Sequence, residues 1–353
     1  MLNNNSGNKT KYMDIYQDLN YAINNGAYPF KSYLPTERAL SEHYGVSRLT
    51  IRKAIDKLVD EAKIRRIQGA GNMVLVKTHE NKGDIIVLAF SNDHGIKIQQ
   101  PFMEMLLNSF NDQCKNKGLN LLYVSLKKGD PVDSLLLDKS RVRGVVFVSE
   151  ISDKFVKLAM DVRIPAVLLF NKRTDVIGIN PNNHQGSFAA TEYVVEKGAK
   201  KVAFISGIPS YYNSRTRLAG YKSALACNGI LLDEGLIAEG DWSSESGYIA
   251  MSDLLENNAK IDAVVAANDT MALGAMRLLS ERGFSVPQDL QVIGFDNITQ
   301  CEFSTPMLST VSIDTEFITT LALSLLNAQA SDGVKLNEEI LVQTRLQLRE
   351  STK

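Results

Sequence analysis

The sequence of 353 residues predicts an α/β protein with a small helical head and a larger body of parallel sheets. Two short helical patterns, separated by a tight turn, occupy residues 34–66. From Ile85 onward, short apolar runs alternate with longer helical segments. Strands separated by helices form parallel sheets that are covered on both faces, so the body is expected to be doubly wound. With about 270 residues, the body is long enough for two lobes.

The helices of the head are predicted from their caps and their periodicity. The first begins at Thr36, whose hydroxyl can cap a helix, and Glu37 lies in its first turn, where the helix dipole favours an anion. Tyr44-Gly45-Val46 forms the turn, and Ser47 caps the second helix. On this second helix the apolar residues recur at the spacing of one buried stripe, which comprises Ile51, Ala54, Ile55 and Leu58.

The opposite side of the second helix is cationic and carries Arg48, Arg52, Lys53 and Lys57. A short amphipathic helix with outward cations, held by a tight turn, is what the major groove of DNA accepts. The alternative is an ordinary solvated helix face. Residues 1–80 hold 12 Lys and Arg against 8 Asp and Glu, whereas the rest of the chain holds 27 against 32. This asymmetry favours a head that binds double-stranded DNA and a body that stays clear of it.

The head resembles the winged helix-turn-helix of GntR-type bacterial regulators. The resemblance rests on Leu34-Pro35-Thr36-Glu37-Arg38 and on Tyr44-Gly45-Val46-Ser47-Arg48-Leu49-Thr50-Ile51-Arg52, and it runs from about Lys11 to Lys77. It implies a wing with its tip at Gly69-Ala70-Gly71, between strands 64–68 and 73–77. After this tip the sequence reads Gly71-Asn72-Met73-Val74, where the family usually has Gly-Thr-Phe-Val. By position, the resemblance implies DNA contacts from Arg38, Ser47, Arg48, Thr50, Arg52, Gly69 and Gly71.

In the body, the clearest strands are predicted at 85–90, 119–124, 145–148, 166–170, 202–205, 263–267 and 291–295, with helices at 101–117, 185–197 and 270–282. Open parallel sheets bind ligands beyond the carboxyl ends of their strands. Here those ends are polar: Ser91-Asn92-Asp93, Ser149-Glu150, Asn171, Ser206, Asn268-Asp269 and Asp296-Asn297. Such a mixture of carboxylates and amides suits a polyol, whose hydroxyls both donate and accept. Loops after strands are polar in any case, and Asp269 can simply cap the helix that starts at Thr270.

From Asp84 to its end, the chain resembles the LacI/GalR regulators and the sugar-binding proteins of periplasmic type. The matching stretches include 198–207, 215–221, 267–275 and 292–297. The resemblance implies a periplasmic-binding-protein-like body, in which crossover strands join two lobes and a ligand is held in the cleft. It implies that Arg217 donates to sugar oxygens, that Asp296 accepts from vicinal hydroxyls, and that Trp242 stacks on the sugar ring. By position, the effector contacts would be Asn171, Arg217, Trp242, Asn268 and Asp296.

The expected domains are a winged helix-turn-helix at residues 1–77, a linker at 78–83, and an effector and dimerisation domain at 84–353. A GntR-like head on a LacI-like body resembles the arabinose-responsive repressors. The expected function is a homodimeric transcriptional repressor of sugar-utilisation genes, released from its operator by a monosaccharide such as arabinose, fucose or rhamnose. A nucleobase or a sugar phosphate as the effector, and co-repression or activation in place of release, are the alternatives.

Other classes of function have less support. The sequence lacks GxSxG, GxxxxGK[ST], HExxH, and GxGxxG after a strand, so an enzyme with catalytic residues is not expected. The cysteines (Cys114, Cys227 and Cys301) are scattered, and together with the histidines they predict no disulfide framework, metal site or cofactor. The polar start of the chain lacks the apolar core of a signal peptide, and no apolar run has the length of a membrane span. A cytoplasmic regulator is therefore expected rather than a secreted transport protein.

Overall fold

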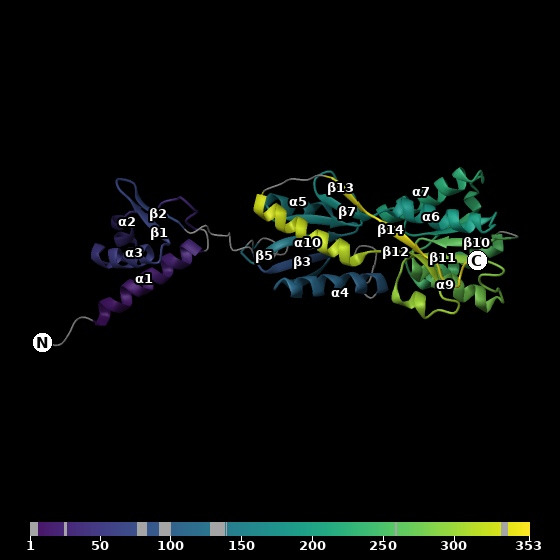
Figure 1. Ribbon diagram of the computed structural model, residues 1–353, viewed down its shortest axis with the longest axis horizontal. Coiled ribbons are helices and arrows are strands. Elements are labelled where there is room, and N and C mark those ends of the chain that lie inside the picture. Colours follow the sequence, from purple (N-terminus) through teal and green to yellow (C-terminus); the bar gives the residue numbers. More distant parts are fainter. Residues whose placement is uncertain are drawn as a thin grey trace. The chain divides into compact units, whose positions relative to one another are not determined.

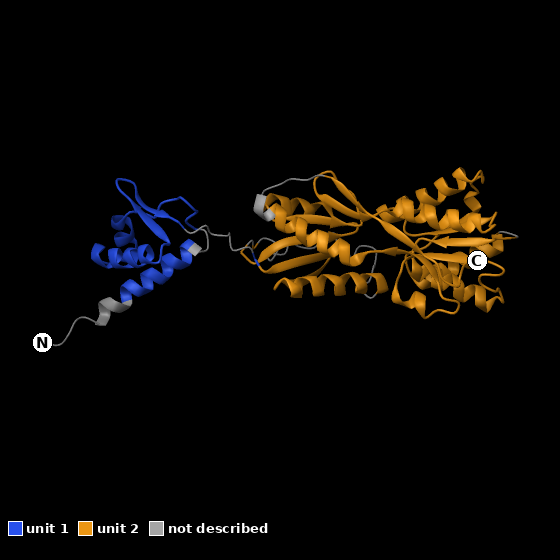
Figure 2. Ribbon diagram, viewed as in Figure 1, with its two compact units in different colours: residues 1–83 blue, residues 84–353 orange. Residues whose placement is uncertain are grey.

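A computed structural model describes residues 6–24, 27–75, 83–91, 100–127, 138, 140–257, 260–332 and 338–353. The chain divides into two compact units, which we call the head (Met1–Gly83) and the body (Asp84–Lys353) (Figure 2). Apart from Gly83, the expected linker at 78–83 lies outside the described residues.

The head contains three helices and a two-stranded antiparallel sheet among its described residues: α1 (Ser6–Asn24), α2 (Glu37–Tyr44), α3 (Arg48–Asp60), β1 (Ile64–Ile67) and β2 (Gly71–Val74) (Figure 1). As predicted, Thr36 caps α2 by accepting from the N–H of Ala39, and Ser47 caps α3 by accepting from the N–H of Thr50. Between them, Gly45 adopts a φ of 62°, the left-handed conformation that ends a helix.

The core of the head forms where α3 meets α1. The predicted stripe on α3 (Ile51, Ala54, Ile55 and Leu58) is fully buried. It belongs to the same apolar cluster as Ile15, Leu19 and Ile23 of α1, which recur every fourth residue and therefore share one helix face. In the wing, β2 begins at Gly71, two residues before the predicted strand, and Ile67 pairs with Gly71 across the turn.

The first lobe of the body has a sheet of order β13-β7-β6-β5-β3-β4, in which every neighbouring pair is parallel. Side chains of β3 alternate between its faces: Val87 and Ala89 join a cluster with Phe155 of α5, whereas Leu88 joins the cluster that holds Phe110 of α4. Both faces are thus covered. The elements are β3 (Ile85–Ser91), α4 (Pro101–Asn116), β4 (Asn120–Leu126), β5 (Val142–Val148), α5 (Asp153–Asp161), β6 (Ala166–Leu169), β7 (Ile177–Pro181), α10 (Thr315–Asp332) and β13 (Glu339–Val342).

The second lobe has a sheet of order β14-β12-β11-β10-β8-β9, which is parallel except for the pair of β12 and β14. Helices α6 and α7 pack together on one face, and α8 packs with α9 on the other (Figure 1). The elements are α6 (Asn183–Glu196), β8 (Val202–Ser206), α7 (Tyr212–Cys227), η2 (Glu234–Leu236), β9 (Ile237–Glu239), α8 (Ser244–Asn257), β10 (Ala263–Ala266), α9 (Asp269–Glu281), β11 (Gln291–Asp296), η3 (Thr299–Glu302), β12 (Ser309–Ile313) and β14 (Thr344–Gln347).

The described chain passes between the two lobes after β7, after β12 and after β13. The crossings after β7 and after β13 touch each other, since the N–H of Asn182 donates to the carbonyl of Val342 at 2.7 Å and the hydroxyl of Thr344 donates to the carbonyl of Asn182 at 3.4 Å. The doubly wound, two-lobed fold is as predicted, and all seven predicted strands of the body are present. None of the described helices is long and apolar enough to cross a membrane.

Candidate functional site

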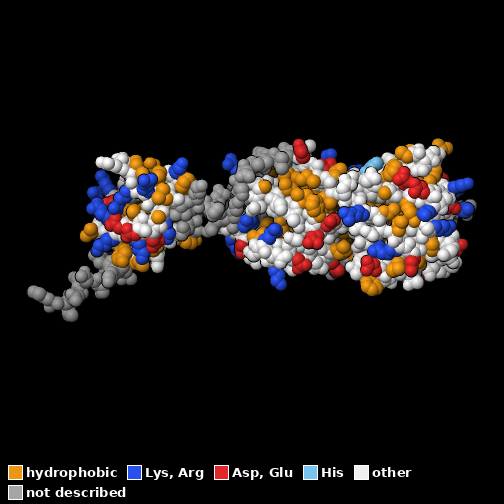
Figure 3. Space-filling view, viewed as in Figure 1, with side chains coloured by type: hydrophobic (Ala, Val, Ile, Leu, Met, Phe, Trp, Pro, Cys, Tyr) orange, Lys and Arg blue, Asp and Glu red, His pale blue; other side chains and the backbone are white. Residues whose placement is uncertain are grey.

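The exposed face of α3 carries Arg48, Leu49, Arg52 and Lys53. Within residues 27–75 the structure gives Arg48 no ion pair, so its guanidinium is available to a ligand. Leu49 lies beside it and is 64% exposed. Figure 3 shows Lys and Arg side chains on the visible face of the head, with acidic side chains among them.

The other two predicted arginines of the head are paired. Nη2 of Arg52 lies 2.8 Å from Oε2 of Glu37, a contact that joins α3 to the first turn of α2. Nε of Arg38 lies 2.9 Å from Oε1 of Glu42, and both of these side chains are more than 60% exposed. An exposed pair of this kind contributes little to stability and opens readily for another anion. Both arginines therefore still present a cation at the surface.

Thr50 is largely buried in the head. The resemblance implied a polar DNA contact from this residue, and that contact stays a prediction; in the structure its side chain is 6% exposed and its hydroxyl lies 2.9 Å from that of Ser47. Thr50 precedes Ile51 and lies on the edge of the buried stripe. Ser47 itself is exposed at the start of α3.

The wing tip is glycine-rich for a conformational reason. Gly69 and Gly71 have φ values of 81° and 112°, which residues with a Cβ rarely adopt. Both are exposed. The tip can therefore approach another backbone closely, as a DNA-contacting wing requires.

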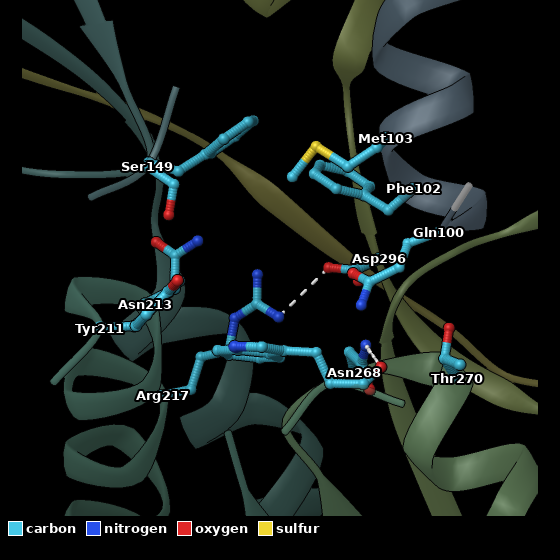
Figure 4. A pocket seen from close by; sticks show the side chains of 12 residues that line it. Gln100, Phe102, Met103, Ser149, Tyr211, Asn213, Arg217, Asn268, Thr270 and Asp296 are labelled. Carbon is cyan, nitrogen blue, oxygen red and sulfur yellow. Dashed lines mark hydrogen bonds and ion pairs between the residues drawn. The ribbon is translucent and has the colours of Figure 1, made fainter. Parts of the chain in front are cut away.

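In the body, a cavity lies between the two lobes at the carboxyl ends of their strands (Figure 4). The second lobe supplies most of its polar lining, including Asn213 and Thr270 with the predicted Arg217, Asn268 and Asp296. The first lobe supplies apolar groups, namely Phe102, Met103 and Phe170. Four of the five predicted effector contacts, Arg217, Trp242, Asn268 and Asp296, thus border one cavity.

The centre of the polar wall is a buried ion pair. Nη1 of Arg217 lies 3.2 Å from Oδ1 of Asp296 (Figure 4), and Nε of Arg217 donates to Oδ1 of Asn183 at 2.9 Å. The guanidinium also stacks on Phe295, with its central carbon 3.7 Å from the ring centroid. Burial raises the pKa of Asp296, while Arg217 opposes that rise.

Two buried polar atoms that belong to cavity-lining residues have no hydrogen-bond partner among the residues that the structure describes. One is the acceptor Oδ1 of Asp296, whose approach to Arg217 has the distance of an ion pair but not the geometry of a hydrogen bond. The other is the donor Nε1 of Trp242. Unpaired buried polar groups are costly, so their presence at one cavity indicates a place that a polar ligand completes.

Backbone conformation also distinguishes this cavity. Ser149, Phe170, Trp242 and Asp296 all line it, and their φ values are 63°, 61°, 75° and 115°. Each is a residue with a Cβ in the left-handed region, which costs on the order of 1–3 kcal/mol. Strain of this kind collects at functional sites because the surrounding fold must stabilise it.

The side chain of Asn268, which was predicted to contact the effector, makes its hydrogen bonds to the protein backbone. Its Oδ1 accepts from the N–H of Met271 at 2.9 Å, which makes it the N-cap of α9, and its Nδ2 donates to the carbonyl of Trp242 at 3.1 Å. Asn268 therefore holds Trp242 at the cavity wall. Asp269, which the sequence offered as the cap, is instead the first residue of the helix.

Asn171 does not border the cavity. Its Nδ2 donates to Oε2 of Glu150 at 2.9 Å, and its Oδ1 accepts from the N–H of Lys172 at 2.7 Å. Both polar atoms of this amide are thus used inside the first lobe. These bonds hold the loop that follows β6, and they leave no polar atom of Asn171 at the cavity wall.

Hydrogen bonds near the cavity also join the lobes. Oε1 of Glu150 accepts from the N–H of Tyr212 at 3.0 Å, so a carboxylate of the first lobe faces the N-terminus of α7 in the second. The hydroxyl of Tyr212 donates to Glu339 on β13, and Glu339 pairs with Lys172 at 2.8 Å. Burial, followed by the bond to Glu339, raises the pKa of Tyr212. We call these four residues the inter-lobe latch.

The sequence did not predict several lining residues. Asn213 had a usable signal, because it lies four positions before Arg217 on α7 and so shares its helix face. Phe102, Met103 and Phe170 had no such signal, since apolar residues at these positions also fit a core. Among the described residues, no group of three or more His, Cys, Asp or Glu side chains could hold a metal ion.

Known protein families match both units. Residues 11–74 match a family described as bacterial regulatory proteins, gntR family, and residues 191–352 match a periplasmic binding protein-like domain. The probable HTH-type transcriptional repressor ExuR of Bacillus subtilis is 34% identical over 232 residues, which are 65% of this chain and 68% of that protein.

Two further similarities concern proteins of Escherichia coli. The HTH-type transcriptional regulator AscG is 46% identical over 132 residues, so the match spans only 37% of this chain and 39% of AscG. The crystal structure of a sugar-binding transcriptional regulator of the LacI family, complexed with phosphate, is 30% identical with a TM-score of 0.62. That similarity covers 76% of this chain and 98% of the other.

Proposed function

Because this chain belongs to the LacI family of transcriptional regulators and carries a GntR-type helix-turn-helix head, we propose that it is a sugar-released repressor. The head binds double-stranded operator DNA, and a neutral monosaccharide binds in the cavity of the body. The observation that carries the effector proposal is the pair of buried unpartnered atoms, Oδ1 of Asp296 and Nε1 of Trp242. A sugar hydroxyl donates to the first, and a sugar oxygen accepts from the second.

The charge of the lining supports a neutral effector. Among the described residues that line the cavity, Arg217 is the single cation, and Asp296 already balances it. A phosphate would bring further negative charge to a site without a spare cation. A sugar phosphate is therefore a weaker candidate than a free sugar, although one relative with the LacI fold was crystallised with phosphate.

A nucleobase is the second candidate, because the lining is rich in aromatic side chains: Phe102, Phe170, Tyr211 and Trp242. Flat rings stack on such side chains, and so do the apolar faces of sugars. The polar wall favours the sugar, since a buried carboxylate beside an arginine matches vicinal hydroxyls that both donate and accept.

Release of DNA follows from cavity closure in this proposal. A sugar that contacts both lobes stabilises one arrangement of the lobes, and it lowers DNA affinity only by as much as it discriminates between arrangements. A near-palindromic operator requires two heads, so we propose a homodimer. Sedimentation equilibrium of the full chain tests this proposal, and a monomer at micromolar concentration would argue against it.

The first experiment is a thermal-shift screen of the full chain against arabinose, fucose, rhamnose, other monosaccharides, nucleobases and sugar phosphates. A ligand that binds only the folded state raises the melting temperature. A stabilising sugar is then added to the protein on a duplex selected from a random-sequence library, and binding is followed by fluorescence anisotropy. In the anisotropy assay, loss of the protein–DNA complex on addition of sugar supports release, and tighter DNA binding indicates co-repression. In the thermal-shift screen, stabilisation by nucleobases alone rejects a sugar as the effector.

A further inference from the structure

Asp269 is a completely buried carboxylate next to the cavity, and the proposed effector contacts leave it unused. It does not cap α9, because Asn268 does. Its Oδ2 accepts a hydrogen bond of 2.9 Å from the N–H of Ile298, and its Oδ1 accepts one from the hydroxyl of Thr310. Both donors lie close to the turn that follows Asp296.

That turn has an unusual backbone. Asp296 and Asn297 are consecutive residues with φ values of 115° and 59°. The N–H of Asn297 donates to Oγ1 of Thr310 at 3.3 Å, and the next N–H, that of Ile298, donates to Asp269. Two successive N–H groups of the turn are therefore held by one buried carboxylate, one directly and one through Thr310.

The fit around Asp269 leaves no room for movement toward β11. A Cβ on Gly294 would lie 2.1 Å from Oδ1 of Asp269 and 3.0 Å from its Cα. The strand that carries Asp296 thus needs a glycine here so that the carboxylate can reach its donors. The side chain of Asn297 is held by a residue near the end of the chain, since Nη2 of Arg349 donates to its Oδ1 at 2.8 Å.

We propose that Asp269 is a positioning residue of the effector site. Its carboxylate holds the turn after β11, so that the carboxylate of Asp296 stays beside Arg217 at the cavity wall. The inference rests on the proposed effector site and goes beyond it, because Asp269 does not itself line the cavity.

The charges around Asp269 make this role measurable. Burial raises the pKa of Asp269, and repulsion by Asp296 raises it further. The other ionisable groups that act on this pair are the guanidinium of Arg217 and the thiol of Cys301, whose own pKa is raised by burial. Arg217 lowers the pKa of Asp296, so a displacement of Asp296 away from Arg217 must raise that pKa.

The test removes the hydroxyl of Thr310, which joins Asp269 to the turn, and it leaves the carboxylates of Asp269 and Asp296 unmodified. Thr310→Val deletes the hydroxyl between Asp269 and the turn, whereas Thr310→Ser keeps it. Thr319→Val is the matched control, because Thr319 is also 0% exposed and its hydroxyl bonds instead to that of Ser109 in the first lobe. The carboxyl carbons of aspartate are followed by NMR in the full chain during a pH titration. Asp269→Asn and Asp296→Asn assign the two resonances.

We expect Thr310→Val to raise the pKa of Asp296 by roughly half a unit or more, while Thr310→Ser and Thr319→Val leave it unchanged. An unchanged titration in Thr310→Val overturns the proposal. So does an equal shift in Thr310→Ser, because the hydroxyl would then not be the link. No effector is needed for this measurement, so a failed sugar screen rejects the proposed function and leaves this test intact.

A second measurement uses whichever monosaccharide of the panel stabilises the unmodified protein. Thr310→Val should weaken its binding about tenfold, and Thr310→Ser should stay within about twofold. Operator binding should be the same in both variants. Equal sugar affinity in Thr310→Val and the unmodified protein would show that the turn does not position Asp296 for the ligand.

Discussion

Nη1 of Arg217 lies 3.2 Å from Oδ1 of Asp296, and their side chains are only 3% and 7% exposed. Such a pair is stable only while both partners are present, because a single buried charge without its partner is strongly destabilising. Within the described part of the chain, Oδ1 of Asp296 accepts no hydrogen bond. Stability of the body and, in the proposed function, recognition of the effector therefore depend on the same two side chains.

Removal of one partner should affect both properties. Asp296→Ala leaves Arg217 buried and uncompensated, so we expect the free energy of unfolding of the body to fall by about 3–5 kcal/mol. The response to sugar should be lost, while operator binding at low temperature should persist. Urea denaturation and anisotropy with and without sugar measure these effects.

The double variant Arg217→Met with Asp296→Leu serves as the control. It replaces the pair by apolar groups, so stability should recover while the sugar response stays absent. A sugar response at ordinary concentrations in Asp296→Ala would show that the effector binds elsewhere.

Arg48 should bind DNA independently of the body. Arg48→Ala should weaken operator binding by about 1–3 kcal/mol if Arg48 contacts a base, and it should reduce the slope of log affinity against log salt by about one if Arg48 contacts a phosphate. Sugar binding should not change. Arg215→Ala, which removes an exposed arginine from the body, is the matched control and should alter neither quantity. Normal affinity and slope in Arg48→Ala would mean that α3 docks differently.

The buried carboxylate of Asp269 predicts a pH dependence of stability. Its pKa is raised on folding, so its contribution to stability is fully present below the ordinary range of aspartate and is lost as pH rises through the raised value. Asp269→Asn lacks this loss, and it should gain stability relative to the unmodified protein between about pH 5 and about pH 8. Urea denaturation of both proteins at each pH measures the difference in their free energies of unfolding. If this difference were the same at the lower and the higher pH, the raised pKa of Asp269 would be contradicted.

The inter-lobe latch should contribute to effector affinity. Tyr212→Phe removes the hydroxyl that donates to Glu339 in the other lobe, so the arrangement of the lobes around the cavity loses a charge-assisted hydrogen bond. We expect the dissociation constant for the effector to rise by about tenfold or less. Tyr248→Phe is the control, since its hydroxyl donates to Glu281 at 2.7 Å within the second lobe. Calorimetric titration should show no change for it.

Local pattern accounts for much of what the sequence predicted. The caps Thr36 and Ser47 and the stripe on α3 depend on spacing along one helix, and the strands of the body depend on short apolar runs bounded by polar residues. Arg217 and Asp296 lie within motifs that a family resemblance can locate. Each of these features depends on residues that are close together in the sequence, so one sequence is enough to predict it.

Features that depend on distant partners were not predictable in this way. Asp269 and Asn268 both suit the start of α9, and only the position of Thr310, 41 residues later in the chain, makes Asp269 an acceptor for another segment. The burial of Thr50 depends on how α3 packs in the head. The strands β12, β13 and β14 are short, and each is completed by pairing with a strand that is distant in the sequence.

The chain contains a single tryptophan, and it is Trp242 in the wall of the cavity. Its ring centroid lies 6.0 Å from the central carbon of the Arg217 guanidinium. Excitation of tryptophan therefore yields light from the cleft alone, with no background from the head or from bound DNA. The protein thus contains an intrinsic fluorescent group at the cavity, with which binding of an effector to the proposed site can be followed in a stopped-flow experiment.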